Sequence, residues 1–268
     1  MNKFVLKDVS VFHKDAGTLL DHISFSVPEE GIFSILGETG SGKTLLVKIM
    51  VGLRPYGMKT EGEVIYYEDK SYSILKLSKK KIHLLRGSSL LWIPQNSGGA
   101  LNPLLSCEKQ VLLPLEKKIG LSKKEAKERI RVLFDYLGLC PTEKVLTMYP
   151  HELSGGMKVR LMIAIGIAME SKILILDEPT KGLDHELGFQ LMELLHRVSK
   201  EKKMKLIIIT HDLPLARKYT DACAVLYKGK LIDTGDAKKV LSKDGHPYLR
   251  ALWNALPVHG MEVSMDDD

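Results

Sequence analysis

The chain has 268 residues, of which 44% are hydrophobic and 27% charged, so it can bury a full α/β core like an ordinary globular protein. The net charge is +6, but the lysines stand in short runs without interleaved aromatic residues, and we therefore expect no nucleic-acid partner. Cys107, Cys140 and Cys223 form no CxxC pair, which excludes a motif-type zinc site and fits a reducing cytoplasm. No signal peptide is readable, and the longest apolar run, at 161–169, is far shorter than the about 20 residues of a spanning helix.

The chain begins with segments that read as an antiparallel sheet. Residues 4–12 and 23–27 alternate apolar and polar side chains, and a turn at 28–31 leads into a short apolar strand at 32–36. Phe12 or His13 could stack on a nucleotide base, and packing into the core or the turn would explain either residue equally well.

A glycine-rich loop follows this strand and precedes a helical pattern at 45–51. Strand, loop and helix in this order are the context of a P-loop, whose backbone N–H groups point at phosphate oxygens. The lysine is expected to reach the β- and γ-phosphates of a nucleoside triphosphate, and the last hydroxyl to bind Mg²⁺. The predicted nucleotide-binding residues are Gly37, Glu38, Thr39, Gly40, Ser41, Gly42, Lys43 and Thr44.

The periodicity changes after this loop. A strand at 62–67 and a basic helix at 78–85 precede a buried-type strand, 89–95, that ends on Gln95. Alone, Gln95 is typical of a polar loop residue. From about residue 96 a 3.6-residue spacing predicts helices over 106–119 and 122–137, so we expect a helical insertion in an α/β body.

Ser154, Gly155 and Gly156 come directly before a long helical pattern. A serine cap and free N–H groups make such a helix start able to bind an anion. From these residues alone, an ordinary helix start and a second phosphate site both remain open.

Two apolar strands end on side chains that suit phosphate chemistry. Residues 173–176 run into Asp177 and Glu178, and residues 205–210 run into His211. Ligands of open α/β sheets bind where parallel strands end. Asp177 is expected to hold Mg²⁺, and Glu178 to orient or deprotonate the attacking water. His211 is expected to contact the γ-phosphate or hold Glu178 in place, with a simple loop hydrogen bond as the alternative.

The remaining chain contains a turn at 181–184, a helix at 185–198, a hairpin at 224–233 and short helices. In this order the motifs resemble those of ABC-type ATPases over nearly the whole chain. The corresponding segments are Walker A at 37–44, the Q-loop at Gln95, the signature at 153–157, Walker B at 173–178, the D-loop at 183–184 and the switch histidine at 211. Stretches at 100–103, 149–157 and 246–252 are similar to the branch that imports peptides and nickel.

This resemblance implies an α/β P-loop NTPase fold with a RecA-like core, an antiparallel β subdomain and an inserted α-helical subdomain at about 96–159. The nucleotide-binding domain would cover 1–245, and 246–268 would form a short tail of the peptide/nickel importer type. It further implies that Ser154, Gly155, Gly156 and Asp184 act on ATP held by a partner cassette. Gln95 would join Thr44 and Asp177 at Mg²⁺ and take part in catalysis with Glu178 and His211.

The implied function is ATP hydrolysis that drives import by dimer closure at the cytoplasmic face of the cell membrane. The implied partners are a second ATPase subunit, two permeases and an extracytoplasmic solute-binding protein. Met157 stands where most relatives have glutamine, as in one of two non-identical ATPase subunits. Lys181 and Gly182 depart from the usual Thr-Ala, and the short tail without cysteine favours nickel-type members over peptide-type ones.

Two other classes of function are open to a protein with these motifs. A soluble, non-transport ABC ATPase acting on DNA or ribosomes would be expected to carry a coiled-coil insertion, zinc cysteines or a second cassette, and none is visible. A non-hydrolysing ATP sensor would not need Glu178 and His211.

Overall fold

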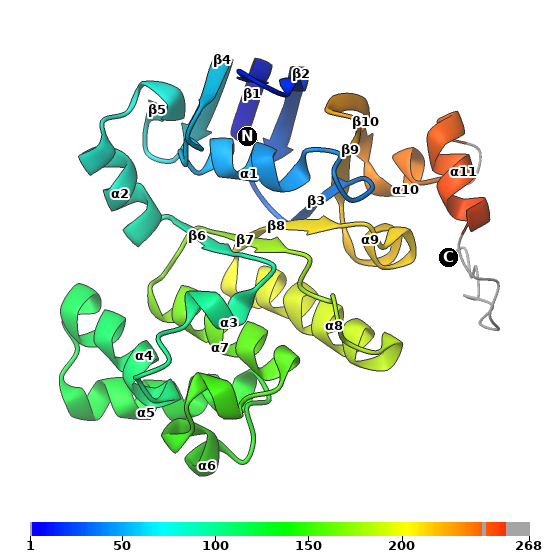
Figure 1. Ribbon diagram of the computed structural model, residues 1–268. Helices are drawn as coiled ribbons and strands as arrows, with labels where there is room; N and C mark the ends of the chain where they lie inside the picture. The colour runs from blue at the N-terminus through cyan, green and yellow to red at the C-terminus, as the bar shows by residue number, and fades with distance from the viewer. Residues whose placement is uncertain (1, 243–244, 256–268) are drawn as a thin grey trace.

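The structure is a computed structural model that describes residues 2–242 and 245–255 (Figure 1). Its strands form one ten-stranded sheet in the order β5-β4-β1-β2-β10-β9-β3-β8-β7-β6. The strands are β1 (Asn2–His13), β2 (Gly17–Pro28), β3 (Ile32–Leu36), β4 (Met58–Tyr67), β5 (Ser71–Ser73), β6 (Leu90–Ile93), β7 (Ile173–Asp177), β8 (Lys205–Thr210), β9 (Ala222–Tyr227) and β10 (Lys230–Asp236).

The helices fall into three groups: a long segment between β6 and β7, helices that connect other strands, and two helices that follow β10 (Figure 1). They are α1 (Lys43–Met50), α2 (Lys79–Ser88), α3 (Ser97–Ala100), α4 (Cys107–Pro114), α5 (Lys123–Tyr136), α6 (Thr142–Thr147), α7 (Gly155–Ala168), α8 (His185–Lys202), α9 (Leu213–Tyr219), α10 (Ala237–Val240) and α11 (Pro247–Ala255), with a π-helical turn at Leu115–Ile119.

The sheet has a parallel part and an antiparallel part. β6, β7, β8, β3 and β9 pair in parallel, whereas β1, β2, β4 and β5 pair antiparallel, as the sequence predicts for the N-terminal strands. β10 joins the two parts, since it pairs antiparallel with β9 and in parallel with β2 through Lys230 and Asp21. The P-loop strand β3 therefore lies inside the sheet, with its carboxyl end at the edge where β7 and β8 also end.

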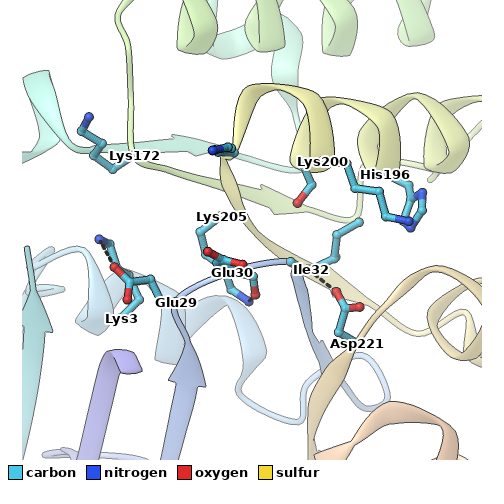
Figure 2. Close-up of a pocket in the computed structure, with 12 residues that line it drawn as sticks. Lys3, Glu29, Glu30, Ile32, Lys172, His196, Lys200, Lys205 and Asp221 are labelled. Atoms are coloured by element: carbon cyan, nitrogen blue, oxygen red, sulfur yellow. Dashed lines mark hydrogen bonds and ion pairs between the residues drawn. The ribbon is translucent and has the colours of Figure 1, made fainter. Parts of the chain in front are cut away.

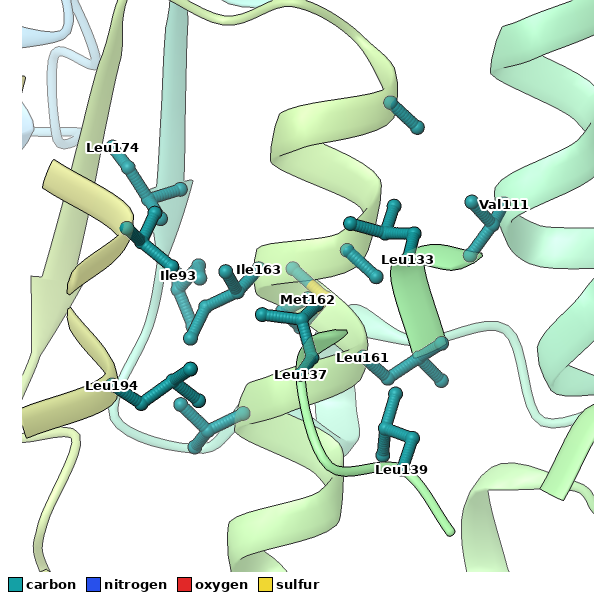
Figure 3. Packing of buried hydrophobic residues seen from close by; sticks show 14 of the residues in the cluster. Ile93, Val111, Leu133, Leu137, Leu139, Leu161, Met162, Ile163, Leu174 and Leu194 are labelled. Carbon is teal, nitrogen blue, oxygen red and sulfur yellow. The ribbon is translucent and has the colours of Figure 1, made fainter. Parts of the chain in front are cut away.

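Alternate residues of β7 and β8 face two different hydrophobic cores, as the period-2 geometry of a strand requires. Leu174 and Leu176 pack in one core with α7 and α8, whereas Ile173 and Ile175 pack in the other with α1. Figure 3 shows the first core, where Met162 and Ile163 of α7 lie between strand residues and the inserted helices. The helices that begin at Lys43 and Gly155 thus cover opposite faces of the same strands (Figure 1).

The helices before α7 belong to the first core as well. Phe134 and Leu133 of α5 are buried in the same cluster as Leu161 of α7, and Figure 3 labels Leu133 and Leu161. Ser122 caps the start of α5 with the predicted capping box. The single helix predicted over 106–119 is wrong in one respect. α4 ends at Pro114, and residues 115–119 form a π-helical turn that Gly120 closes with a φ of 80°. Proline has no N–H to continue the α-helical bonds, which explains the break.

Within residues 2–242 and 245–255, none of the helices combines the length and the apolar character that crossing a bilayer demands. The part of the predicted tail at 256–268 lies outside the described residues.

A pocket of about 560 Å³ opens where β3 and β8 begin (Figure 2). Lys205, the first residue of β8, is only 2% exposed, and its ammonium donates a 2.7 Å hydrogen bond to the carbonyl of Glu30. Burial lowers the pKa of Lys205 to about 8, because a charge is less well solvated inside the protein. Parallel strands begin here and end at the P-loop, so this pocket lies at the edge of the sheet opposite the predicted site.

The lowered pKa of Lys205 makes the stability of the protein depend on pH. Its charge opposes folding below about pH 8, and this cost is relieved as the pH rises from about 8 towards 10.5, where an unfolded lysine titrates. Between pH 7.5 and 10, the unfolding free energy of the wild type should therefore rise by roughly 2–3 kcal/mol relative to Lys205→Met. Urea unfolding under reducing conditions measures this difference.

The matched control is Lys203→Met, which removes an exposed lysine at the same pocket. Its unfolding free energy should keep a constant offset from the wild type over this range. A constant offset between Lys205→Met and the wild type would contradict the lowered pKa of Lys205. All three proteins share the same tyrosines and cysteines, so the contributions of these groups cancel in the difference of unfolding free energies.

Candidate active site

The loop between β3 and α1 depends on two glycines. Gly37 has a φ of 147°, and an added Cβ there would collide with the carbonyl oxygen of Leu226 in β9 and lie 2.6 Å from the Ser41 hydroxyl. Gly42 takes the left-handed conformation, with a φ of 101°, at the start of α1. Side chains resist these conformations, so glycine lets the loop turn its N–H groups inward directly after a buried strand.

Lys43 lies inside this loop. It is 6% exposed, and its ammonium donates hydrogen bonds to the carbonyls of Gly37, at 2.6 Å, and Glu38, at 2.8 Å. Burial lowers the pKa of Lys43, while the nearby carboxylates of Glu178 and Asp177 oppose that shift. Backbone carbonyls therefore hold the positive charge, and the two acidic residues at the end of β7 lie near it.

Thr44 and Asp177 form a second contact at this edge. The Thr44 hydroxyl donates a 2.8 Å hydrogen bond to a carboxylate oxygen of Asp177, which is 3% exposed. Burial raises the pKa of Asp177, whereas the bond from Thr44 opposes that shift. Hydroxyl and carboxylate oxygens suit Mg²⁺, but the described residues contain no cluster of three or more His, Cys, Asp and Glu that could hold a metal unaided. A magnesium ion here would need phosphate oxygens and water as well.

Glu178 and His211 meet where β7 and β8 end. The His211 Nδ1 atom lies 2.8 Å from a carboxylate oxygen of Glu178, whose side chain is 10% exposed, whereas that of His211 is 60% exposed. Glu178 has a left-handed φ of 50°, and its N–H donates to the carbonyl of Ile209 in β8. The backbone thus turns sharply after Asp177 and places the Glu178 carboxylate against the imidazole, as one of the two sequence hypotheses for His211 expects.

The other predicted residues occupy separate positions. Gln95 is exposed two residues after β6, which pairs with β7 and ends at the same edge. Phe12 is half-buried near the end of β1, opposite Thr18 and Lys59, and no described contact tests its stacking on a base.

Ser154 and Asp184 both cap helices. The Ser154 hydroxyl accepts from the N–H of Met157 at 3.3 Å, and Asp184 accepts from the N–H of Leu187 at 2.9 Å. Gly155 and Gly156 lie close to the Leu183 side chain, so the signature segment adjoins the D-loop. Among the hydrogen bonds of the described residues, none joins the Ser154 or Asp184 side chain to Lys43, Thr44 or Glu178, so these segments form a second group.

Sequence reasoning missed the contacts that brace the P-loop from outside. The N–H of Gly229, in the β9–β10 turn, donates to the Ser41 carbonyl at 3.1 Å, and the N–H of Glu38 donates to the Tyr248 hydroxyl at 3.2 Å. Tyr248 falls in a stretch that carries the family resemblance, but no local pattern indicates a partner 210 residues away.

Comparison with known proteins decides which family shares this arrangement. The model of the ABC transporter family matches residues 20–181. The dipeptide transport ATP-binding protein DppD of Haemophilus influenzae is 36% identical over 255 residues, which are 94% of this chain and 77% of that protein. This chain belongs to the ABC transporter family. The dipeptide transport ATP-binding protein DppD of Escherichia coli is 34% identical over 89% of this chain and 72% of its own length.

Solved structures of the family agree with the fold. The cbiO1 protein of Clostridium perfringens, part of the ABC transporter complex cbiONQ, superposes with a TM-score of 0.78 at 28% identity, covering 96% of each chain. The dimeric ATP-binding cassette MJ0796, bound to ADP and phosphate, gives a TM-score of 0.74 at 27% identity, covering 87% of this chain and 98% of that one. The predicted ABC ATPase fold and ATPase activity are thereby confirmed, and ATP is supported as the nucleotide.

The contact between His211 and Glu178 predicts a selective kinetic defect. If Glu178 acts on the attacking water as the sequence leads us to expect, His211→Ala should lower kcat by roughly 100-fold or more, because the carboxylate loses the imidazole that it contacts. The Kd for a non-hydrolysable ATP analogue should stay within about threefold of wild type, because Lys43 and the loop are unchanged. Steady-state ATPase assays and calorimetric titration measure the two quantities.

His196→Ala is the control, since His196 lines the pocket at the opposite edge of the sheet. It should leave kcat unchanged. Equal losses of kcat in both variants, or a loss of affinity alone in His211→Ala, would refute the positioning role.

Proposed function

We propose that this chain is the ATP-binding and ATP-hydrolysing subunit of an importer that carries peptides across a membrane. The observation that carries the proposal is the convergence of Lys43, the Thr44–Asp177 pair and the Glu178–His211 pair at one edge of the sheet. Relatives of this chain over most of its length are named dipeptide transport and peptide import ATP-binding proteins. They do not favour the alternative of a soluble, non-transport ATPase.

The described contacts support a role for each residue at the phosphates. The P-loop amides would bind the β- and γ-phosphates, and the Lys43 ammonium would move from the two loop carbonyls to phosphate oxygens. Thr44 and Asp177, with Gln95, would hold Mg²⁺, which when bound neutralises charge on the phosphates. Glu178, oriented by His211, would accept the proton of the attacking water.

The second group of residues supports a dimer as the active unit. The helices that start at Lys43 and Gly155 cover opposite faces of the parallel strands, each with its own N-terminal amides. We propose that the Ser154–Gly156 segment and Asp184 act on the ATP of a partner cassette. Two permeases and an extracytoplasmic solute-binding protein would complete an importer at the cytoplasmic face of the cell membrane, with residues 1–245 as the nucleotide-binding domain and 96–159 as its helical subdomain.

The names of the relatives favour peptides as cargo over nickel. Nickel, the other cargo that the resemblance implies, stays a prediction.

The proposed role of Glu178 predicts a trapped state. Glu178→Gln keeps the size of the side chain but removes the proton acceptor, so turnover should fall by roughly 10²–10⁴-fold while ATP still binds. With no hydrolysis to reopen it, the ATP-bound dimer should accumulate, which size-exclusion chromatography with ATP and Mg²⁺ detects.

Glu170→Gln makes the same change at a surface residue that pairs with Arg129, and it should hydrolyse ATP like the wild type. Normal turnover in Glu178→Gln would show that another group accepts the proton.

The cargo can be identified by uptake into vesicles. Vesicles that contain the chain with its co-purified permeases should accumulate a labelled dipeptide when ATP and the ATPase subunit are inside and the binding protein is outside. Labelled nickel should not accumulate above the background measured with Glu178→Gln. Uptake of nickel alone would reverse the proposed cargo. Co-purification of nucleic acid without permeases would favour the non-transport alternative.

A further inference from the structure

The segment His246-Pro247-Tyr248 builds the start of α11, a helix that the proposed mechanism leaves without a role. The His246 Nδ1 atom accepts a hydrogen bond from the N–H of Tyr248 at 3.2 Å, and the His246 carbonyl accepts from the N–H of Leu249 at 2.8 Å. Pro247 is the first helical residue, where its fixed φ suits a helix and no N–H is required. His246 and Pro247 therefore define where α11 begins, and the bond from the Tyr248 N–H to His246 holds the backbone of Tyr248.

α11 packs against the strands that lead into the candidate active site. Leu249 is fully buried in a cluster with Leu36, the last residue of β3, and with Val225 of β9. Leu252 and Trp253, one turn further along, pack on the same cluster. In Figure 1 the helix lies beside α10, on the side of the molecule where β9 and β10 are found. Its position is thus tied to the strand end from which the P-loop departs.

Tyr248 links this helix to the P-loop itself. Its hydroxyl accepts a hydrogen bond from the N–H of Glu38 at 3.2 Å, and its ring centroid lies 4.4 Å from that of Tyr227, at the end of β9. Leu226, the residue before Tyr227, places its carbonyl oxygen where a side chain on Gly37 would be. The end of β9 therefore supports the first residue of the loop directly and the second residue through Tyr248.

The Glu38 backbone is held from both sides. Its N–H bonds to Tyr248, while its carbonyl accepts from the Lys43 ammonium at 2.8 Å and from the N–H of Ser41 at 3.1 Å. When Lys43 turns to a phosphate, the carbonyl loses its charged partner. The hydrogen bond from the Glu38 N–H to Tyr248 lies outside the loop and can persist, so it can hold the Glu38 backbone in place when Lys43 moves to the phosphate.

We propose that Tyr248 is a positioning residue for ATP binding, which holds the Glu38 amide and so keeps the P-loop in a conformation that accepts phosphate. The inference rests on the proposed role of this loop in binding ATP. It makes α11 part of the nucleotide site, since a shift of that helix would change the affinity for ATP without any contact to the nucleotide.

The test is the substitution Tyr248→Phe, which removes the hydroxyl and keeps the ring. Loss of one hydrogen bond that orders the loop should raise the Kd for a non-hydrolysable ATP analogue roughly three- to tenfold. The kcat at saturating ATP should stay near the wild-type value, since Glu178 and His211 are untouched. Without nucleotide, hydrogen exchange in the loop peptide 37–44 should become faster.

The matched control is Tyr227→Phe, which makes the same substitution in the neighbouring ring and removes the hydroxyl of Tyr227. Its affinity and loop exchange should equal those of the wild type, and thermal unfolding should show that both variants are folded. An unchanged Kd in a folded Tyr248→Phe protein, or an equal increase in Tyr227→Phe, would overturn the proposal. Failure of the wild type to bind the analogue would instead refute the proposed function.

Discussion

The site depends on how one buried positive charge is compensated. Lys43 is almost fully enclosed, and the loop carbonyls of Gly37 and Glu38 supply its hydrogen bonds. An enclosed ammonium is costly unless it is hydrogen-bonded, so the loop must bring its carbonyls close to the lysine. Glycine conformations at 37 and 42 make this approach possible, and the end of β9 with the turn after it contacts the loop. The nearby carboxylates of Asp177 and Glu178 add to the compensation.

A parallel sheet with two covered faces explains why the other groups gather at the same edge. β3, β8 and β7 lie side by side and run in the same direction, so the residues that follow them meet although they are far apart in the sequence. Thr44 reaches Asp177, and Glu178 reaches His211, from three different parts of the chain. The same strands expose alternate residues to α1 and to α7, which separates the two helix starts that the proposed mechanism assigns to two nucleotides.

The sequence allowed close prediction wherever a local pattern decides the structure. The strands at 32–36 and 205–210 have the predicted bounds, and α5 begins with the predicted capping box, because strand burial and helix caps are written in neighbouring residues. The short helices α6 and α9 were not predicted, since helices of this length owe their stability to tertiary packing. The bond between Tyr248 and Glu38 has no local signal. The roles of Gln95, Ser154, Asp184 and Phe12 remain predictions that need a bound nucleotide or a partner.

At Glu178 the position of the side chain and the stability of the backbone make opposite demands. Its φ of 50° aims the carboxylate at His211, yet an L-amino acid adopts such a conformation only at a cost of about 1–2 kcal/mol, which glycine would escape. Glycine at this position would relieve the strain but would also remove the carboxylate that the proposed chemistry needs. The protein without nucleotide thus carries backbone strain at Glu178, the residue that is proposed to accept the proton from water. Stability is lower at this one residue so that the carboxylate can take its position.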